Sequence, residues 1–177
     1  MGTRTVDTGA GWRSMVSRSR LLTAFVAGFV ATHIATVTGY WYHGIFLEDL
    51  DWPAFNGFLI VPNESTLAQF WTGTVYHYAT GISFGLIFAF LIHPLFRGGN
   101  STAGNIGKAL VFSLVLALLS AAWWVPALFP EFSPGVFSTN LGTKVVIGIF
   151  VWHLIYGINL GALYNPLPEE RVGGVAG

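Results

Sequence analysis

Four long apolar segments run through the sequence, and each is long enough to cross a lipid bilayer as a helix. A transmembrane helix needs about 20 apolar residues at a rise of about 1.5 Å per residue. Charged residues make up only 9% of the chain, whereas they make up about 25% of an average soluble domain. The sequence therefore predicts an all-α, four-helix integral membrane protein with spans at Leu21–Tyr42, Leu67–Leu95, Gly107–Phe129 and Val145–Tyr164.

The basic residues predict which side of the membrane each loop faces. Lysine and arginine are concentrated in the cytoplasmic loops of membrane proteins. Seven of the eight basic residues fall on one predicted side, and Lys144 is the exception. We therefore expect a multi-pass protein of the prokaryotic cytoplasmic (inner) membrane with both termini in the cytoplasm. It would consist of an N-terminal arm (1–20), a membrane domain (21–166) and a C-terminal tail (167–177).

Composition excludes several classes of function. The formal net charge is zero, which argues against a nucleic-acid partner. Cysteine is absent, so the chain has no disulfides, no thiolate metal sites and no cysteine-ligated iron–sulfur clusters. Any redox chemistry would need histidine ligands or a bound organic cofactor.

An internal repeat relates the second and fourth spans. The segments Val75–Gly85 and Val151–Gly161 are offset by 76 residues (151 − 75) and share the pattern Val-x-His-x-x-x-Gly-Ile-x-x-Gly. Each span ends in a polar residue followed by proline, at His93-Pro94 and Asn165-Pro166. The first and third spans resemble each other only weakly. The repeat predicts a bundle built from two tandem helix hairpins.

Within each repeat, histidine and two glycines fall four residues apart and share one helix face. A stripe of small residues at this spacing lets two helix backbones approach closely. The second and fourth spans run in the same direction, so their histidines lie at matching depth. The two predicted packing faces are His77, Gly81, Gly85 and His153, Gly157, Gly161.

The first span carries its own small-residue stripe, at Ala24, Gly28, Ala31 and Ala35. His33 has the same predicted depth as the other two histidines but lies on the opposite side of that helix at about 100° per residue. If the stripe faces the bundle, His33 faces outward. If His33 faces inward, the stripe is free to dock another protein. Either arrangement suggests a larger assembly.

Several hypotheses for the histidines within the predicted spans stay open. Histidine within a membrane span is costly and marks a candidate functional site. His77 and His153 could bind haem b as axial ligands, although Lys144 is the only basic residue near the outer face for its propionates. His33, His77 and His153 could bind a metal ion, and a chlorophyll-type pigment could use a single histidine. The simplest alternative is hydrogen bonding across helices, with candidate partners Thr80, Ser83, Ser120, Tyr156 and Asn159.

Three segments together resemble a known kind of protein. They are Ala27–Thr32, His77–Gly85 and His153–Tyr164. They resemble an uncharacterised family of small four-helix integral membrane proteins of bacteria and archaea. The resemblance covers Leu21–Pro166 and implies the four-helix topology, without a known reaction or functional residues.

The sequence leads to one main hypothesis for function and one alternative. We expect an accessory, non-catalytic subunit of a larger membrane complex, respiratory or electron-transferring, whose partners are other membrane subunits and the lipid bilayer. The reasons are the lack of a recognisable catalytic pattern, the number of small-residue stripes and the aromatic outer loops. The alternative is a small b-type cytochrome in which His77 and His153 hold the haem.

Overall fold

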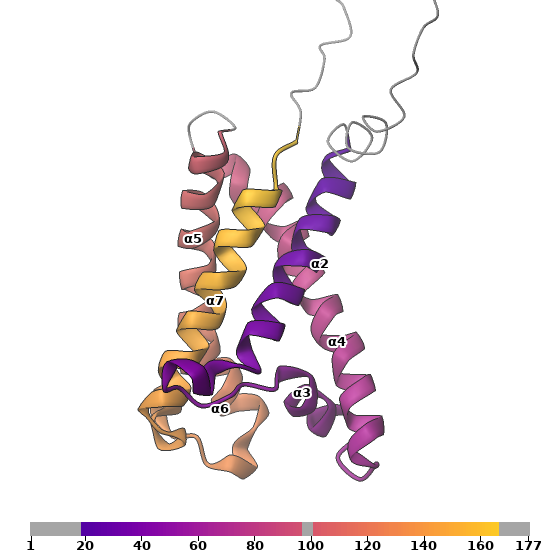
Figure 1. Cartoon of the computed structure of the whole chain (residues 1–177), viewed down its shortest axis with the longest axis vertical. Coiled ribbons are helices and arrows are strands. Elements are labelled where there is room, and N and C mark those ends of the chain that lie inside the picture. Colours follow the sequence, from indigo (N-terminus) through magenta and orange to yellow (C-terminus); the bar gives the residue numbers. More distant parts are fainter. Residues whose placement is uncertain (1–18, 97–100, 167–177) are drawn as a thin grey trace, which may run out of the picture.

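The structure, a computed structural model, describes residues 19–96 and 101–166. Its regular structure within these ranges is helical, and four helices are long and apolar enough to cross a membrane (Figure 1). They are α2 (Arg20–Gly39), α4 (Thr66–Ile87), α5 (Thr102–Leu119) and α7 (Thr143–Leu163). The predicted all-α, four-span membrane protein is confirmed. The predicted arm and tail lie outside the described residues, apart from Ser19 and Arg20 at the start of α2.

Serine caps start three of the long helices. The side chains of Ser19, Ser65 and Ser101 each accept a hydrogen bond from the backbone N–H three residues later, at 3.1, 3.3 and 3.1 Å. Such a cap satisfies one of the N–H groups that the first helical turn leaves unpaired. These caps fix where α2, α4 and α5 begin.

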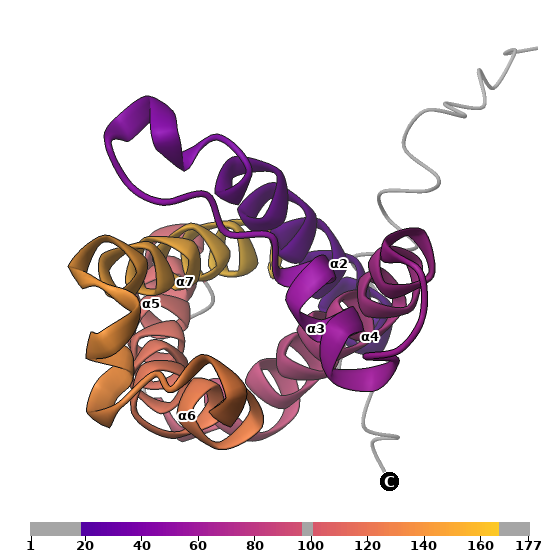
Figure 2. The same ribbon diagram turned by 90° about the horizontal axis from the view of Figure 1, so that it is seen from below.

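The helices form two hairpins that surround a common centre. α2 packs against α4, α5 packs against α7, and α2 and α7 join the two pairs. Figure 2 shows this ring from the end opposite the described termini. We call that end the loop end and the other the terminal end. α4 meets α5 mainly at the terminal end, where Phe84 and Phe88 contact Phe112 with ring centroids 6.4 and 5.8 Å apart. The tandem-hairpin prediction is confirmed.

Glycine makes both hairpin crossings possible. A Cβ atom added to Gly85 would lie 2.8 Å from Cα of Gly28, and one added to Gly161 would overlap the backbone of Ile106. Gly81 and Gly157 leave room for Thr32 and Ser113 in the same way. Each glycine face of the repeat is therefore filled by the preceding long helix of its own hairpin.

The small-residue stripe of α2 is also filled from within the chain. Its four residues are all buried: Ala24, Gly28, Ala31 and Ala35. They lie on the side of α2 that packs against α4 and α7. The expectation that the chain has more such stripes than its own bundle needs is therefore wrong, and the stripes give no support for a further partner.

Two prolines deform the helices near their ends. The π-helical segments η2 (Phe88–Ile92) and η4 (Ser120–Trp124) end two residues before Pro94 and Pro126. Proline has no N–H for the helical ladder and crowds the preceding turn, so the backbone widens there. The carbonyl of Ala121 in η4 accepts a hydrogen bond at 2.8 Å from the hydroxyl of Ser138, which lies outside that segment. A wide turn of this kind redirects the side chains that it carries.

The loop end is covered by short helices and aromatic side chains. α3 (Trp52–Ile60) begins at Asp51, whose carboxylate accepts from the N–H of Ala54 at 2.9 Å, and lies against α4. Phe55 of α3 contacts Phe129 and Phe132 of the second loop, with ring centroids 6.2 and 6.0 Å apart. The two loops predicted to be aromatic thus pack on each other. α6 (Val125–Leu128) and the 3-10 segments η5 (Pro130–Phe132) and η6 (Val136–Leu141) complete this layer.

Candidate functional site: a cavity between the two hairpins

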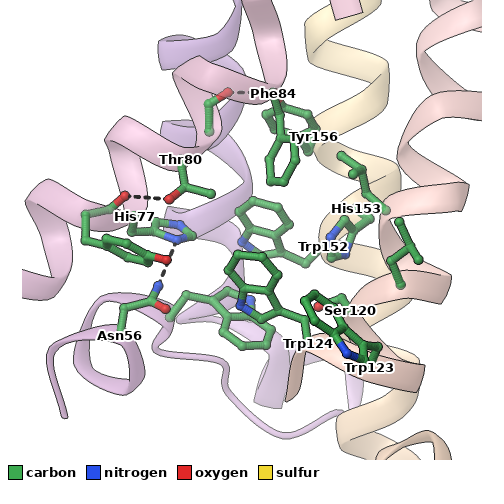
Figure 3. Close-up of a pocket in the computed structure, with 15 residues that line it drawn as sticks. Asn56, His77, Thr80, Phe84, Ser120, Trp123, Trp124, Trp152, His153 and Tyr156 are labelled. Carbon is green, nitrogen blue, oxygen red and sulfur yellow. Dashed lines mark hydrogen bonds between the residues drawn. The ribbon is translucent and has the colours of Figure 1, made fainter. Parts of the chain in front are cut away.

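A cavity of about 270 Å³ lies between the hairpins, in the half of the bundle nearer the loop end (Figure 3). α3 covers it with Trp52 and Asn56. Its floor toward the terminal end is formed by Phe84, Leu116 and Tyr156. α4, α5 with η4, and α7 form its walls. Both histidines of the repeat line it, so the structure brings the predicted pair to a single site.

His77 is held on both ring nitrogens. The hydroxyl of Thr36 donates to the carbonyl of Thr32 at 2.7 Å, so it accepts from Nε2–H of His77 at 2.9 Å. The amide of Asn56 then donates to Nδ1, at a longer 3.4 Å. This assignment of the ring proton follows from the partners. His77 therefore joins α2, α3 and α4 and has no lone pair to offer a metal without losing one of these bonds.

His153 is held on one nitrogen only. Its Nδ1–H donates to the carbonyl of Ile149 at 2.8 Å, one turn earlier in α7. Because Nδ1 carries the proton, Nε2 of the neutral ring is an acceptor. No described residue hydrogen-bonds to Nε2, although the side chain is only 9% exposed and lines the cavity.

Trp152 lies between the two imidazoles (Figure 3). Its ring centroid is 5.4 Å from that of His77 and 5.1 Å from that of His153. Trp152 also stacks on Tyr156 at 5.7 Å and 7°, and the hydroxyl of Tyr156 donates to the carbonyl of Gly81 at 2.8 Å. The indole occupies the space in which one metal ion would bind both imidazoles.

His33 lies away from this cavity. It is exposed on the outer side of α2, and its Nδ1 is 2.7 Å from the hydroxyl of Tyr78. The alternative left open by the sequence is therefore settled: the stripe faces the bundle and His33 faces outward. Within residues 19–96 and 101–166, no three His, Cys, Asp or Glu side chains gather to hold a metal ion. The predicted three-histidine metal site is wrong because His33 points away from His77 and His153.

Sequence reasoning missed the actual partners of the histidines. Thr80, Ser83 and Asn159 bond to carbonyls of their own helices instead of to an imidazole. It also missed two tryptophans of the cavity wall. The indole N–H groups of Trp52 and Trp152 are buried and have no hydrogen-bond partner in the described part of the chain. Buried polar groups are nearly always paired, so each such group needs an explanation.

A second polar cluster closes the terminal end of the bundle. Nε2 of His93 lies 2.9 Å from the side-chain oxygen of Asn105, whose amide donates to the carbonyl of Tyr164 at 2.8 Å. Arg20 donates to the hydroxyl of Tyr164 at 3.1 Å and to the carbonyl of Ala89. His93, the polar residue at the end of the second predicted span, is buried. The cluster ties together the ends of all four long helices.

At the loop end, His43 and Asp49 form an exposed pair. The backbone N–H of His43 donates to the carboxylate at 2.8 Å, and its Nδ1 lies 2.9 Å from the second carboxylate oxygen. The hydrogen bond from this N–H, with the nearby imidazole, lowers the pKa of Asp49. The pair shapes the turn after α2, and neither residue lines the cavity.

Comparisons with known proteins provide no role that could be carried over to this chain. No protein-family model, no curated protein and no solved structure matches the chain. Its function is therefore argued from the cavity itself.

Proposed function

We propose that this chain is an accessory, non-catalytic membrane subunit that binds a small lipid-soluble molecule in the cavity between its hairpins and presents it to a larger electron-transferring complex. The observation that carries the proposal is the combination of an apolar, aromatic cavity with buried polar atoms that lack partners. Binding sites for small molecules typically combine apolar walls with a few such polar groups.

The volume of the cavity limits the size of the ligand. An apolar cavity of about 150 Å³ accommodates benzene, so about 270 Å³ suits one or two rings. Drug-sized ligands occupy pockets of about 300–1,000 Å³. A molecule with a compact aromatic head fits this space.

The rim of the cavity indicates the route of entry. Leu119 and Trp123 line the cavity on the α5 side and are 52% and 60% exposed. Both residues lie within the third membrane-spanning segment, where exposed apolar side chains are expected to face lipid. α3 covers the loop end of the cavity. The ligand would therefore enter sideways from the bilayer, and any alkyl tail would remain among the lipids.

The loop end offers a surface for the partner. Apolar side chains project there, with Trp41 at 68%, Phe46 at 84% and Val136 at 88% exposure. Exposed apolar groups of this size suit a protein interface or the membrane surface. In our proposal the terminal end faces the cytoplasm of a prokaryotic cell, as the basic residues predict. Membership of the family of small four-helix membrane proteins stays a prediction.

A small b-type cytochrome is the second candidate, because Nε2 of His153 is a suitable ligand for haem iron. Three features disfavour the pair His77 and His153 as axial ligands. Trp152 lies between the rings, His77 uses both nitrogens in hydrogen bonds, and the cavity is small for a macrocycle. A single-histidine pigment site meets the same limit of volume.

Purification from the native membrane in mild detergent tests the proposal. We expect co-purification of a defined membrane partner and no Soret band in the isolated chain. A Soret band that disappears in both His77→Ala and His153→Ala would replace the proposal with the cytochrome. A monodisperse chain that never co-purifies with another protein would contradict the accessory role.

A further inference from the structure

The two hairpins treat their repeated histidines differently, and the difference can be traced to one residue. In the first hairpin, Gly81 of α4 faces Thr32 of α2. One turn closer to the loop end on both helices, His77 meets Thr36 and is bonded to it at 2.9 Å. The helices are antiparallel, so this step adds four residues on α2 and subtracts four on α4.

The second hairpin has the same register. Gly157 of α7 faces Ser113 of α5, as Gly81 faces Thr32. The same step of one turn places His153 opposite Ala117, which is 1% exposed. Alanine has no hydroxyl, so the facing helix gives His153 no partner equivalent to Thr36. His153 instead bonds to its own helix through Nδ1, and Nε2 has no partner among the described residues in a side chain that lines the cavity.

A hydrogen-bond acceptor that lines a largely apolar cavity without a protein partner favours a ligand that supplies the donor. The ligand must carry an O–H or N–H group, since a carbonyl cannot donate to Nε2. It should also accept a hydrogen bond, because the indole N–H groups of Trp52 and Trp152 in the cavity wall have no partner among the described residues. A hydroxyl group on an aromatic ring does both.

We propose that the cavity binds the hydroquinone head of a membrane quinol, with one phenolic O–H donated to Nε2 of His153. This inference rests on the proposed function, since it names the class of ligand for the same cavity. The aromatic walls suit the ring, and the exposed rim at Leu119 and Trp123 leaves an exit for an isoprenoid tail. The oxidised quinone, which has no O–H, binds more weakly.

The experiment compares a decyl-substituted benzohydroquinone with its benzoquinone, each titrated calorimetrically into the full chain in detergent. The hydroquinone titration is kept anaerobic with excess dithionite. We expect the hydroquinone to bind roughly tenfold more tightly, the effect of one hydrogen bond to an acceptor in the cavity wall. In protein with ¹⁵N-labelled histidine, it should also shift the Nε2 resonance of His153.

Two variants and a control sharpen the test. His153→Leu removes the acceptor, and Ala117→Ser gives His153 the hydroxyl partner that α5 lacks. Both should abolish the preference for the hydroquinone, and the serine variant keeps the histidine in case the leucine variant fails to fold. Leu118→Ser places the same hydroxyl one position away, on a residue 44% exposed toward lipid, and should leave the preference unchanged.

The possible outcomes separate this inference from the proposed function. A preference for hydroquinone that both variants abolish and the control retains supports the inference. Equal binding of the two forms overturns the inference but leaves the cavity as a ligand site. Binding of neither probe also overturns it, and the wider proposal then depends on whether protein from the native membrane retains another small molecule. A preference that persists in both variants places the hydroquinone elsewhere and overturns the inference as well.

Discussion

Replacing Thr36 by valine tests whether the hydrogen bond to His77 stabilises the first hairpin. The change keeps the shape of the side chain and removes only the hydroxyl. The hydroxyl donates to a carbonyl within its own helix and accepts from Nε2–H of His77 at 2.9 Å. Loss of the intrahelical bond should matter little, because that carbonyl stays in the helical ladder. The main consequence is an imidazole N–H left buried without a partner.

Two free-energy ranges set the expected loss of stability. Leaving a buried donor unpaired costs about 1–3 kcal/mol. Hydrogen bonds between membrane helices contribute about 0.6 kcal/mol on average and up to about 1.7 kcal/mol. Asn56 lies 3.4 Å from the other ring nitrogen and is too distant to compensate well. We therefore expect Thr36→Val to lower the free energy of unfolding by about 1–2 kcal/mol.

The assay is reversible unfolding in mixed micelles, followed by circular dichroism. Thr38→Val is the matched control, because the hydroxyl of Thr38 bonds only to Ile34 and Ala35 of its own helix among the contacts found in the structure. The control should change the free energy of unfolding by less than about 0.5 kcal/mol. Equal effects of the two substitutions would refute the reasoning that His77 joins the helices through Thr36.

Three further predictions concern the remaining contacts. Gly85→Ala should lower the free energy of unfolding by about 1–3 kcal/mol, because the added methyl group crowds α2. Gly107→Ala, whose Cβ would meet nothing within 4 Å, is the control and should be neutral or stabilising. Equal effects of the two substitutions would contradict the close crossing of α2 and α4. Asn105→Ala should destabilise the chain by about 1–3 kcal/mol, because it removes the buried side chain that links His93 to the carbonyl of Tyr164. A neutral result would contradict the role of the terminal cluster. The pKa of Asp49 is lowered in the folded chain, so its stabilising effect is present above its unfolded pKa and is lost as the pH falls through the folded value. The amide NMR signal of His43 should move with this transition, and this acidic step should be absent in Asp49→Asn.

The parts of the fold that depend on periodicity were predictable. The apolar length of the spans, the repeat and the small-residue stripes each follow from spacing along one helix, and the structure confirms all three. The order of helices around the ring depends on contacts between distant segments. The sequence showed that α2 had a small-residue face but not that α4 and α7 would both use it. The small-residue stripes therefore gave no valid argument for an outside partner.

The candidate site was also predictable only in part. His77 and His153 were identified as a pair because the repeat aligns them, and both line the cavity. Their hydrogen bonds were not predictable from the repeat, because they depend on the facing helix, where Thr36 and Ala117 differ. The segment that forms α3 was expected to be part of an aromatic outer loop, so its Asn56 was not considered as a partner. Asp51 is followed two residues later by Pro53, and a capping residue before a proline is typical of a helix start. This pattern was the signal that could have revealed α3.

The most direct test of the cavity is mass spectrometry of the small molecules retained by chain purified from its native membrane. Ser120 lines the cavity, so Ser120→Phe should fill it, whereas Leu118→Phe places the same aromatic side chain on the exposed face of α5. We predict that the natural chain and Leu118→Phe retain one aromatic, lipid-soluble compound that Ser120→Phe lacks. The same set of retained compounds in all three proteins, or phospholipid alone in the natural chain, would contradict the assignment of the cavity as a ligand site.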